Sequence, residues 1–371
     1  MNRTVLYVVP SGGLGGAETF LLHAAGLHEG FRPVFVCLRP GPVVDLLRAR
    51  GATVHVSPTI PRLSRPWAFA KTVRWISSVA VAEKASLIHS TLAYGALLGS
   101  PAARASRLPH FWFQHGPVSG WQDWLAGKLR SEEIFVNSRF TEKKQRGLGT
   151  KTKLRQIRLG VETSAAVVAL PPELCRSRLR EKFLEPVDFV PAILCRPQPQ
   201  KGVLLFLEAL AELRRQGISA GGVLLGGSPA RPSAYETEIS RRAEKLALPF
   251  VHLEQSSAPW EILKGCDALI CSSISPEGYG LTLAEANAYG VPAIAPREGG
   301  PLDLIQEGVN GLLYEPRSVS DLARAMAAIA NNQPLRNSLI TGGFTFAAAE
   351  LAAGGSIHQL ENIYRSHLGD T

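Results

Sequence analysis

The chain has 371 residues, of which 45% are hydrophobic and 19% charged, as is usual for a globular protein with full cores and about two domains. No stretch approaches the roughly 18 to 20 apolar residues of a membrane span, and no separate apolar signal region precedes the first strand-like segment. The net charge of +9 is uneven, because residues 1–165 carry 22 Lys and Arg against 9 Asp and Glu, and the remaining residues 18 against 22.

The first half of the chain alternates strand-like and helix-like patterns. A strand over 4–10 leads into a glycine-rich turn over 11–18 and an apolar helix that ends near His28. Further strands are expected over 33–38, 52–58, 86–91, 110–116 and 133–138. Strands that alternate with helices predict βαβ units on a parallel sheet.

The second half repeats this organisation after an interruption. Pro171, Pro172 and Pro186 break the rhythm and indicate a linker. Strands are then expected over 189–196, 221–227, 250–254, 267–273, 292–296 and 311–316, and helices over 201–217, 234–247, 259–265, 281–290 and 320–331.

The predicted fold class is therefore α/β, with two Rossmann-like domains facing a central cleft, where the carboxyl ends of parallel strands bind ligands. We expect a first domain over 1–165, a linker over 166–187 and a second domain over 188–354. A C-terminal helix over 355–371 is a candidate to pack back on the first domain.

The five cysteines are scattered and form no CxxC pair. This favours small buried hydrophobic residues in a reduced compartment over a disulfide framework or a zinc site. We expect no cofactor and no metal.

Two glycine or basic motifs follow predicted strands. The loop over 11–18 presents backbone N–H groups and a helix start, which suit an anion. It is not a dinucleotide fingerprint, because Glu18 occupies the third glycine position. Arg196 and Lys201 lie five residues apart at another helix start, where two cations suit a diphosphate or are simply solvated surface charges.

The stretch SPEGYGLTLAEA, residues 275–286, carries two carboxylates. Glu277 lies in a turn after an apolar strand, and Glu285 lies about one turn into a helix that Gly290 and Pro292 end. Carboxylates suit vicinal hydroxyls and helix-start amides suit phosphate, so the stretch predicts a nucleotide-sugar site. The alternative is that both glutamates are surface charges.

This region resembles the donor site of the family-four glycosyltransferases, the retaining GT-B group. Its Glu-x7-Glu signature matches Glu277 and Glu285, and its spaced basic pair matches Arg196 and Lys201. The GGAE loop at 15–18, the HG pair at 115–116 and FVNS at 135–138 match as well, so the resemblance covers nearly the whole chain.

The resemblance implies roles for individual residues. The donor diphosphate would meet Arg196, Lys201, Gly280, Leu281, Thr282, Gly15 and Gly16. Glu285 would hold the ribose. The donor sugar would meet Glu277, Gly278, Tyr279 and His115, of which His115 and Glu277 are the catalytic candidates. Cys195, Glu254 and Asp303 depart from the family pattern and leave the sugar and base open.

The implied reaction moves a sugar from a nucleoside-diphosphate donor, UDP favoured, to an acceptor hydroxyl with retention of configuration and no metal. Transition-state charge on the leaving group would be stabilised by preorganised cations and amides. The expected setting is cell-envelope glycolipid or polysaccharide synthesis. Two alternatives remain open, namely a nucleotide-sugar epimerase and a non-catalytic sugar- or nucleic-acid-binding protein.

The basic first half has two interpretations. Residues 62–78 predict a helix with Phe69 and Val73 on one face and Trp67, Lys71, Arg74 and Trp75 on the other. Such a face suits an anionic membrane surface, or a tryptophan packed under arginine stems. We expect a glycolipid or anionic glycan acceptor rather than nucleic acid, in a cytoplasmic protein that is peripheral on the inner face of the cytoplasmic membrane.

Overall fold

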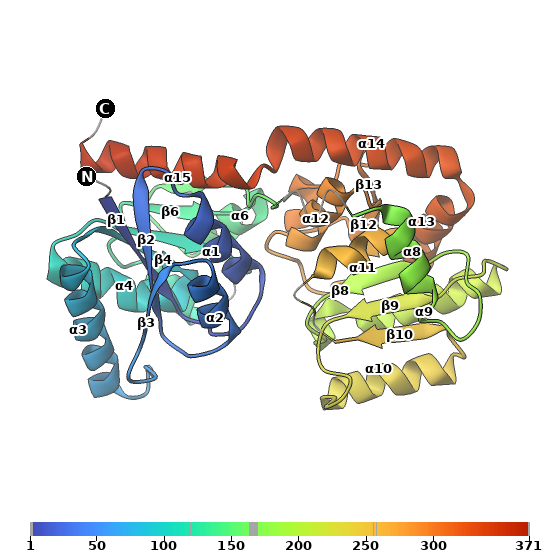
Figure 1. Ribbon diagram of the computed structural model, residues 1–371, viewed down its shortest axis with the longest axis horizontal. Helices are drawn as coiled ribbons and strands as arrows, with labels where there is room; N and C mark the ends of the chain where they lie inside the picture. The colour runs from blue at the N-terminus through green and yellow to red at the C-terminus, as the bar shows by residue number, and fades with distance from the viewer. Residues whose placement is uncertain (1–2, 119, 163–169, 255, 257, 370–371) are drawn as a thin grey trace. The chain divides into compact units, whose positions relative to one another are not determined.

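The computed structural model describes residues 3–118, 120–162, 170–254, 256 and 258–369. The chain divides into two compact units, which are Met1–Gly160 with Ala353–Thr371 (unit 1) and Val161–Ala352 (unit 2) (Figure 1). Each unit contains a parallel sheet flanked by helices. This confirms the predicted α/β class with two Rossmann-like domains.

Unit 1 is built on a seven-stranded parallel sheet with strand order β3-β2-β1-β4-β5-β6-β7. Its strands are β1 (Arg3–Val9), β2 (Phe31–Cys37), β3 (Thr53–Val56), β4 (Ala85–Thr91), β5 (His110–Gln114), β6 (Glu133–Val136) and β7 (Leu154–Gln156). Its helices are α1 (Gly16–Leu27), α2 (Pro42–Ala49), α3 (Pro66–Ala82), α4 (Leu92–Ser106), α5 (Trp121–Ala126), α6 (Arg139–Gly147) and α15 (Ala353–Leu368).

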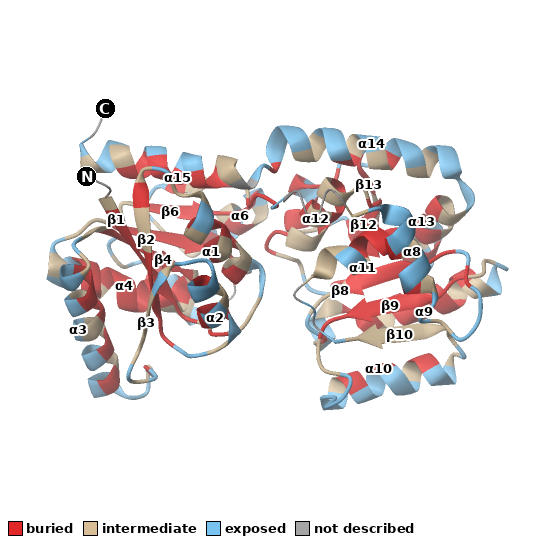
Figure 2. Cartoon of the chain, in the orientation of Figure 1, coloured by how far each residue is buried: buried red, intermediate tan, exposed pale blue. Residues whose placement is uncertain are grey.

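The central strand β1 explains the apolar run near the N-terminus. Val5 to Val9 are all fully buried, because helices cover both faces of a parallel sheet and leave no solvated side. Figure 2 shows buried residues along the inner strands of the sheet, whereas the edge strand β3 is partly exposed. The sequence therefore needs continuous rather than alternating hydrophobic residues here.

Helix α15 belongs to unit 1 although it ends the chain. Its buried Glu361 lies 2.8 Å from Nδ1 of His28 and accepts hydrogen bonds from the amides of Glu29 and Gly30. Burial alone would raise the pKa of Glu361, but these contacts outweigh burial and lower it to about 2. The Tyr364 hydroxyl lies 2.5 Å from Nδ1 of His89. Specific polar contacts thus anchor the helix.

Unit 2 is built on a six-stranded parallel sheet with strand order β10-β9-β8-β11-β12-β13. Its strands are β8 (Pro191–Leu194), β9 (Gly222–Leu225), β10 (Phe250–Leu253), β11 (Ala268–Ile270), β12 (Ala293–Pro296) and β13 (Gly311–Tyr314). Its α-helices are α8 (Pro172–Arg180), α9 (Val203–Arg215), α10 (Ala234–Lys245), α11 (Pro259–Gly265), α12 (Leu281–Tyr289), α13 (Val319–Asn331) and α14 (Gln333–Glu350). Short 3₁₀ turns are η1 (Pro199–Lys201) and η2 (Gly300–Asp303).

Part of the segment expected as a linker, 166–187, is helix α8 of unit 2. Pro172 occupies the first turn of this helix, where a proline is tolerated because its missing N–H has no partner there anyway. Cys175 and Leu179 are four residues apart and both buried, so the helix has an apolar face. The first four linker residues, 166–169, lie outside the described residues.

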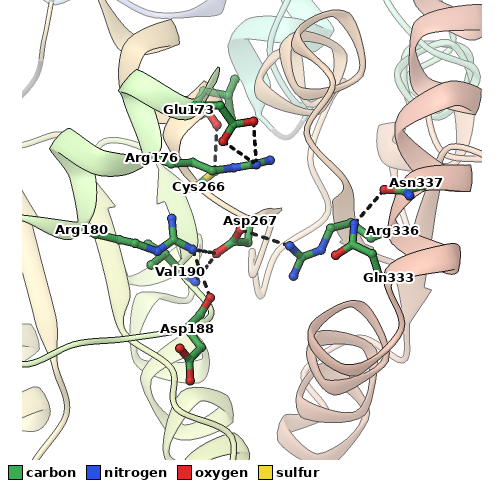
Figure 3. Close-up of polar contacts among 11 residues, drawn as sticks. Glu173, Arg176, Arg180, Asp188, Val190, Cys266, Asp267, Gln333, Arg336 and Asn337 are labelled. Atoms are coloured by element: carbon green, nitrogen blue, oxygen red, sulfur yellow. Dashed lines mark hydrogen bonds and ion pairs between the residues drawn. The ribbon is translucent and has the colours of Figure 1, made fainter. Parts of the chain in front are cut away.

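Asp267 ties α8 and α14 to the start of β11 (Figure 3). Its buried carboxylate accepts hydrogen bonds from Arg180 at 2.8 Å, from Arg336 at 3.3 Å and from the amide of Val190 at 2.8 Å. A buried carboxylate needs such partners because desolvation is otherwise costly. The contacts fix the amino end of the strand whose other end leads to Glu277.

Candidate functional site

Two neighbouring strands of unit 2 bring the predicted donor residues together. Strands β8 and β11 pair in parallel, so their carboxyl ends lie at the same edge of the sheet. Arg196 and Lys201 follow β8, and Glu277 follows β11. The side chain of Lys201 lies 2.6 Å from Glu277 through Nζ and Oε1. Residues 76 positions apart in sequence thus form one ion pair.

The loops that carry this pair are held tightly against each other. Gly202 has a φ of 64°, and a Cβ at this position would lie 2.0 Å from the carbonyl oxygen of Ser272. The Ser272 hydroxyl donates to the carbonyl of Lys201 at 3.0 Å, and the amide of Ile274 donates to Gln200 at 2.9 Å. Glycine is therefore required by both conformation and space. The close approach sets the position of Lys201.

Lys201 is half-buried and charged. Burial alone would lower the pKa of Lys201, but the Glu277 carboxylate outweighs burial and raises the pKa above its ordinary value. The buried Ser273 hydroxyl donates to the same Oε1 atom of Glu277. A partly desolvated cation attracts a bound anion more strongly than a fully hydrated cation does, because the local dielectric constant is lower.

Gly299 and Gly300 pack closely against the turn that carries Glu277. The amide of Gly300 donates to the carbonyl of Glu277 at 2.8 Å. Gly299 has a φ of 75°, and a Cβ on Gly300 would lie 2.3 Å from the carbonyl oxygen of Gly278. Any larger residue would push the turn away, so the pair defines where Glu277 lies.

Helix α12 begins at this turn with open amides. Gly280 is its N-cap with a φ of 100°, and its carbonyl accepts the first intrahelical bond, from Leu283. No side chain of the described residues caps the helix. The amides of Leu281 and Thr282 precede that first bond, as expected at a helix N-terminus that can bind an anion. Gly278 and Tyr279, expected at the sugar, are both buried.

Glu285 lies within the first two turns of α12 and is half-buried. Burial raises the pKa of its carboxyl to about 7. Among the described residues no group forms a hydrogen bond or ion pair with this carboxyl. A half-buried carboxyl without a partner is costly, which makes it a candidate to receive hydroxyl groups of a ligand.

Arg196 is exposed and lies two residues after the end of β8. Its position at the carboxyl edge of the sheet agrees with the predicted diphosphate site, but its side chain is more solvated than that of Lys201. The contribution of Arg196 to binding an anion is therefore expected to be more strongly screened by water.

In unit 1, His115 follows β5 and is buried against two phenylalanines. Its ring stacks on Phe113 with centroids 4.0 Å apart and tilts against Phe20 at 4.9 Å. The Asn137 side chain donates to the backbone carbonyl of His115 at 2.8 Å. Burial lowers the pKa of His115 to about 3, so the ring is neutral near pH 7.

Both ring nitrogens of His115 are buried without a hydrogen-bond partner among the described residues. Buried polar atoms without a partner are rare in folded proteins, so the two nitrogens make His115 a candidate to contact a ligand. Gly15 caps helix α1, which Gly16 begins, with no side-chain cap among the described residues. Gly15 and His115 lie in the loops that follow β1 and β5, and Gly16 is the first residue of α1.

Helix α3 carries the predicted basic and aromatic surface. Trp67 is 66% exposed, and Lys71 and Arg74 are exposed on the same side of the helix. Trp75 was expected on this face too, but it is half-buried against the unit 1 core. Its ring packs on the core cluster that contains Val79, which lies one helical turn further along the same face of α3.

Ser273 and Asn137 are two residues near the site that sequence patterns did not indicate. Each follows a buried strand, β11 or β6, and that position at the carboxyl edge of a sheet was the available signal. Within the described ranges, no group of three His, Cys, Asp or Glu side chains is arranged to hold a metal ion.

Comparisons with known proteins agree with both halves of this architecture. The sequence model of the family described as "Glycosyl transferases group 1" matches residues 184–345, and that of "Glycosyltransferase Family 4" matches residues 14–165. The chain belongs to the family-four glycosyltransferases. The identification rests on both units of the fold.

The curated relatives of this chain have different substrates in their names, and it spans less than two thirds of the length of several of them. A GDP-mannose-dependent alpha-(1-6)-phosphatidylinositol monomannoside mannosyltransferase of Mycobacterium tuberculosis is 25% identical over 85% of this chain and 77% of its own. The alpha-D-kanosaminyltransferase of Streptomyces kanamyceticus is 24% identical over 67% of this chain and 64% of its own. The match with a rice sucrose-phosphate synthase spans only 15% of that protein.

A crystal structure of Anabaena Alr3699/HepE in complex with UDP has the same fold. It superposes with a TM-score of 0.83 and 21% identity, over 98% of this chain and 100% of the Anabaena chain. At this identity the likeness establishes the GT-B fold. No helix in the described part of the chain is long and apolar enough to cross a bilayer.

Proposed function

We propose that this glycosyltransferase moves a sugar from a nucleoside-diphosphate donor to an acceptor hydroxyl with retention of configuration. The observation that carries the proposal is the pairing of Lys201 with Glu277 beside the open start of α12. A cation and free amides suit a diphosphate, and an adjacent carboxylate suits the hydroxyls of a sugar. UDP is the favoured nucleotide of the donor, because the Anabaena neighbour of the same fold is described in complex with UDP.

In the proposed donor complex, Lys201, Arg196 and the amides of Leu281 and Thr282 meet the diphosphate. Gly280 allows the close approach because its φ of 100° needs no side chain. Glu285 accepts hydrogen bonds from the hydroxyls of the ribose. Glu277 accepts a hydrogen bond from a hydroxyl of the sugar. The buried residues Gly278 and Tyr279 fix the turn around Glu277.

The residues of unit 1 receive a separate role in the proposal. The neutral ring of His115 offers the substrate one hydrogen-bond donor and one acceptor, because neither nitrogen is otherwise used. Gly15 and Gly16 leave the start of α1 open to a polar group of the substrate. His115 is too weak a base at a pKa of about 3 to take a proton in the reaction.

In the proposed reaction the bond between the anomeric carbon and the phosphate oxygen breaks as the acceptor oxygen forms its bond on the same face. The acceptor proton passes to the leaving diphosphate. Lys201 and the amides of α12 stabilise the negative charge that develops on the leaving group. This same-face transfer forms no covalent intermediate with the protein, so it needs neither Glu277 nor Glu285 as a nucleophile.

The proposed reaction is tested with UDP-glucose, GDP-mannose and other nucleotide sugars as separate donors. Slow release of nucleoside diphosphate and free sugar from one of them supports the transferase. Conversion to an epimer indicates the alternative enzyme on this fold. Absence of release from every donor, with folded protein confirmed by its thermal transition, argues for a binding protein instead.

We further propose an acceptor at an anionic membrane surface, such as a glycolipid of the cell envelope. Trp67 is exposed beside Lys71 and Arg74, and neither cation has an ion-pair partner among the described residues. Exposed tryptophan with unpaired cations suits an anionic interface. The phosphatidylinositol-mannoside acceptor named for the mycobacterial relative is of this class.

Co-sedimentation with vesicles checks the membrane proposal. We expect recovery with phosphatidylglycerol vesicles and not with phosphatidylcholine vesicles at moderate salt. The variant K71E/R74E should lose the recovery, whereas the control K143E/K144E, on α6, should retain it. Equal recovery with both lipids, or equal loss in both variants, would sink the idea.

A further inference from the structure

The carboxylate of Glu277 is held through only one of its two oxygens. Oε1 accepts from Lys201 Nζ at 2.6 Å and from the Ser273 hydroxyl. Among the described residues, no group bonds to Oε2. Ser273 is 2% exposed, so its hydroxyl has few positions to adopt. One oxygen is therefore saturated by the protein and the other is left with its lone pairs.

A neighbouring thiol favours this direction of the Ser273 hydroxyl. The Sγ atom of Cys271 lies 3.9 Å from Ser273 Oγ, in the geometry of a weak S–H donor. Burial raises the pKa of Cys271 to about 12, so the thiol keeps its proton. A hydroxyl that accepts from one side is free to donate to the other, and Glu277 lies there.

We propose that Ser273 is a positioning residue for donor-sugar recognition, which together with Lys201 fixes Oε1 of Glu277 and presents Oε2 to one hydroxyl of the sugar. This inference rests on the proposed function and deepens it. A carboxylate oxygen can only accept, so the site selects a sugar with a free hydroxyl at the facing position. The corresponding deoxy sugar is disfavoured, because it leaves Oε2 desolvated and unpaired.

Lys201 and Ser273, which both bond to Glu277, differ in whether they can also contact the diphosphate. The Lys201 ammonium has three N–H donors and uses one on Glu277, so two remain for phosphate oxygens. Ser273 bonds to Glu277 and has no path to the diphosphate in these contacts. Loss of the Ser273 hydroxyl should therefore weaken the use of the sugar and leave the affinity for the nucleoside diphosphate unchanged.

A double-mutant cycle tests the proposal on the full-length protein, with UDP-glucose and GDP-mannose as donors and UDP and GDP as ligands without sugar. The variants are S273A, E277Q and S273A/E277Q, with S273T to restore a hydroxyl. We expect S273A to lower kcat/KM for nucleoside-diphosphate release about three- to tenfold, as for one lost hydrogen bond, with Kd for the diphosphate unchanged. S273T should recover most of the loss.

The cycle distinguishes positioning from mere packing. In the E277Q background the S273A change should have no further effect on kcat/KM, because the group that it positions is altered already. The matched control is S272A, which removes an equally buried hydroxyl that bonds to the Lys201 backbone and not to Glu277. S272A should keep the ratio of kcat/KM between the two donors.

Three results would overturn the proposal. These are an equal loss from S273A in both backgrounds, a matching loss of UDP or GDP affinity, and no recovery in S273T that folds as the wild type does. If the wild-type protein releases diphosphate from neither donor and binds neither nucleotide, the proposed function itself fails. If the wild-type protein turns over a donor and the effects of S273A and E277Q on kcat/KM are additive, only the role of Ser273 is rejected.

Discussion

The two sheets of this chain carry different kinds of side chain at their carboxyl edges. In unit 2 the edge carries charges that already bond to each other, with Lys201, Glu277 and Ser273 joined around one oxygen. In unit 1 the edge carries a neutral imidazole, His115, whose ring nitrogens have no partner among the described residues. The edge of unit 2 suits a charged ligand group. The edge of unit 1 provides an apolar surface and single hydrogen bonds from a neutral ring.

The same difference appears in how each edge is stabilised. The unit 2 site is supported by backbone contacts at Gly202 and Gly300 that leave no room for a Cβ. The unit 1 site is supported by aromatic packing of Phe20 and Phe113 around His115. Loss of the Lys201 cation in unit 2 should therefore weaken binding of the charged donor, whereas changes at His115 in unit 1 should alter reactivity with little effect on diphosphate affinity.

The largest effect is expected from K201A. Removal of the cation takes away charge stabilisation of the leaving diphosphate and leaves Glu277 half-buried without its ion-pair partner. We expect kcat/KM for diphosphate release to fall about 100- to 1,000-fold. The control K182A removes an exposed lysine of unit 2 and should leave kcat/KM unchanged. A loss of less than about fivefold in K201A would contradict the assignment.

The second effect concerns His115. H115F keeps a ring in the aromatic pocket and removes both nitrogens, so we expect kcat to fall about 10- to 100-fold, the equivalent of one or two lost hydrogen bonds. The affinity for UDP should stay unchanged. An unaltered kcat would show that the orphaned nitrogens have no role with substrate.

H115F should also change the acid stability of the protein. The pKa of His115 is about 3 in the folded state and about 6.5 in an unfolded chain, so the unfolded chain binds the extra proton between these values. Stability is therefore lost as the pH falls from about 6.5 toward 3. Since phenylalanine does not titrate, the variant should lose less free energy of unfolding across this range. Denaturant titrations at several pH values measure it.

The smallest effect is expected from E285Q. The pKa of Glu285 is about 7, and its ionised form is the better acceptor for two ribose hydroxyls. Wild-type affinity for UDP should therefore increase as the pH rises from 6 to 8, and E285Q should flatten this dependence and weaken binding by about 1 kcal/mol. Calorimetry with 2′-deoxy-UDP is the control, because the wild type should discriminate against it more than E285Q does.

Much of the fold followed from sequence patterns, and the exceptions have physical causes. Buried parallel strands produce apolar runs such as Val5 to Val9, which are easy to recognise. Helix α8 was not recognised because its prolines resemble a break. Helix α14 contains Gly342 and Gly343, where a Cβ would lie 2.0 Å from the carbonyl of Val309 and 2.9 Å from the Asn287 side chain. Close packing, rather than a turn, explains these glycines.

The candidate site was predictable only where residue spacing and chemistry agree. The positions of Lys201 and Glu277 after apolar strands indicated a shared edge, because neighbouring parallel strands end together. The Ser273 contact depends on tertiary register, and the orphaned nitrogens of His115 depend on what surrounds the ring. Neither can be inferred from residue type and spacing alone.

A diphosphate site at Lys201 is tested most directly by calorimetric titration of the wild-type protein and K201A with UDP and with GDP. We expect saturable binding of one nucleotide by the wild type and a loss of at least about tenfold in affinity in K201A, as for a charge-assisted contact. Binding of neither nucleotide by the folded wild type, or equal affinity in both proteins, would contradict a diphosphate site at Lys201.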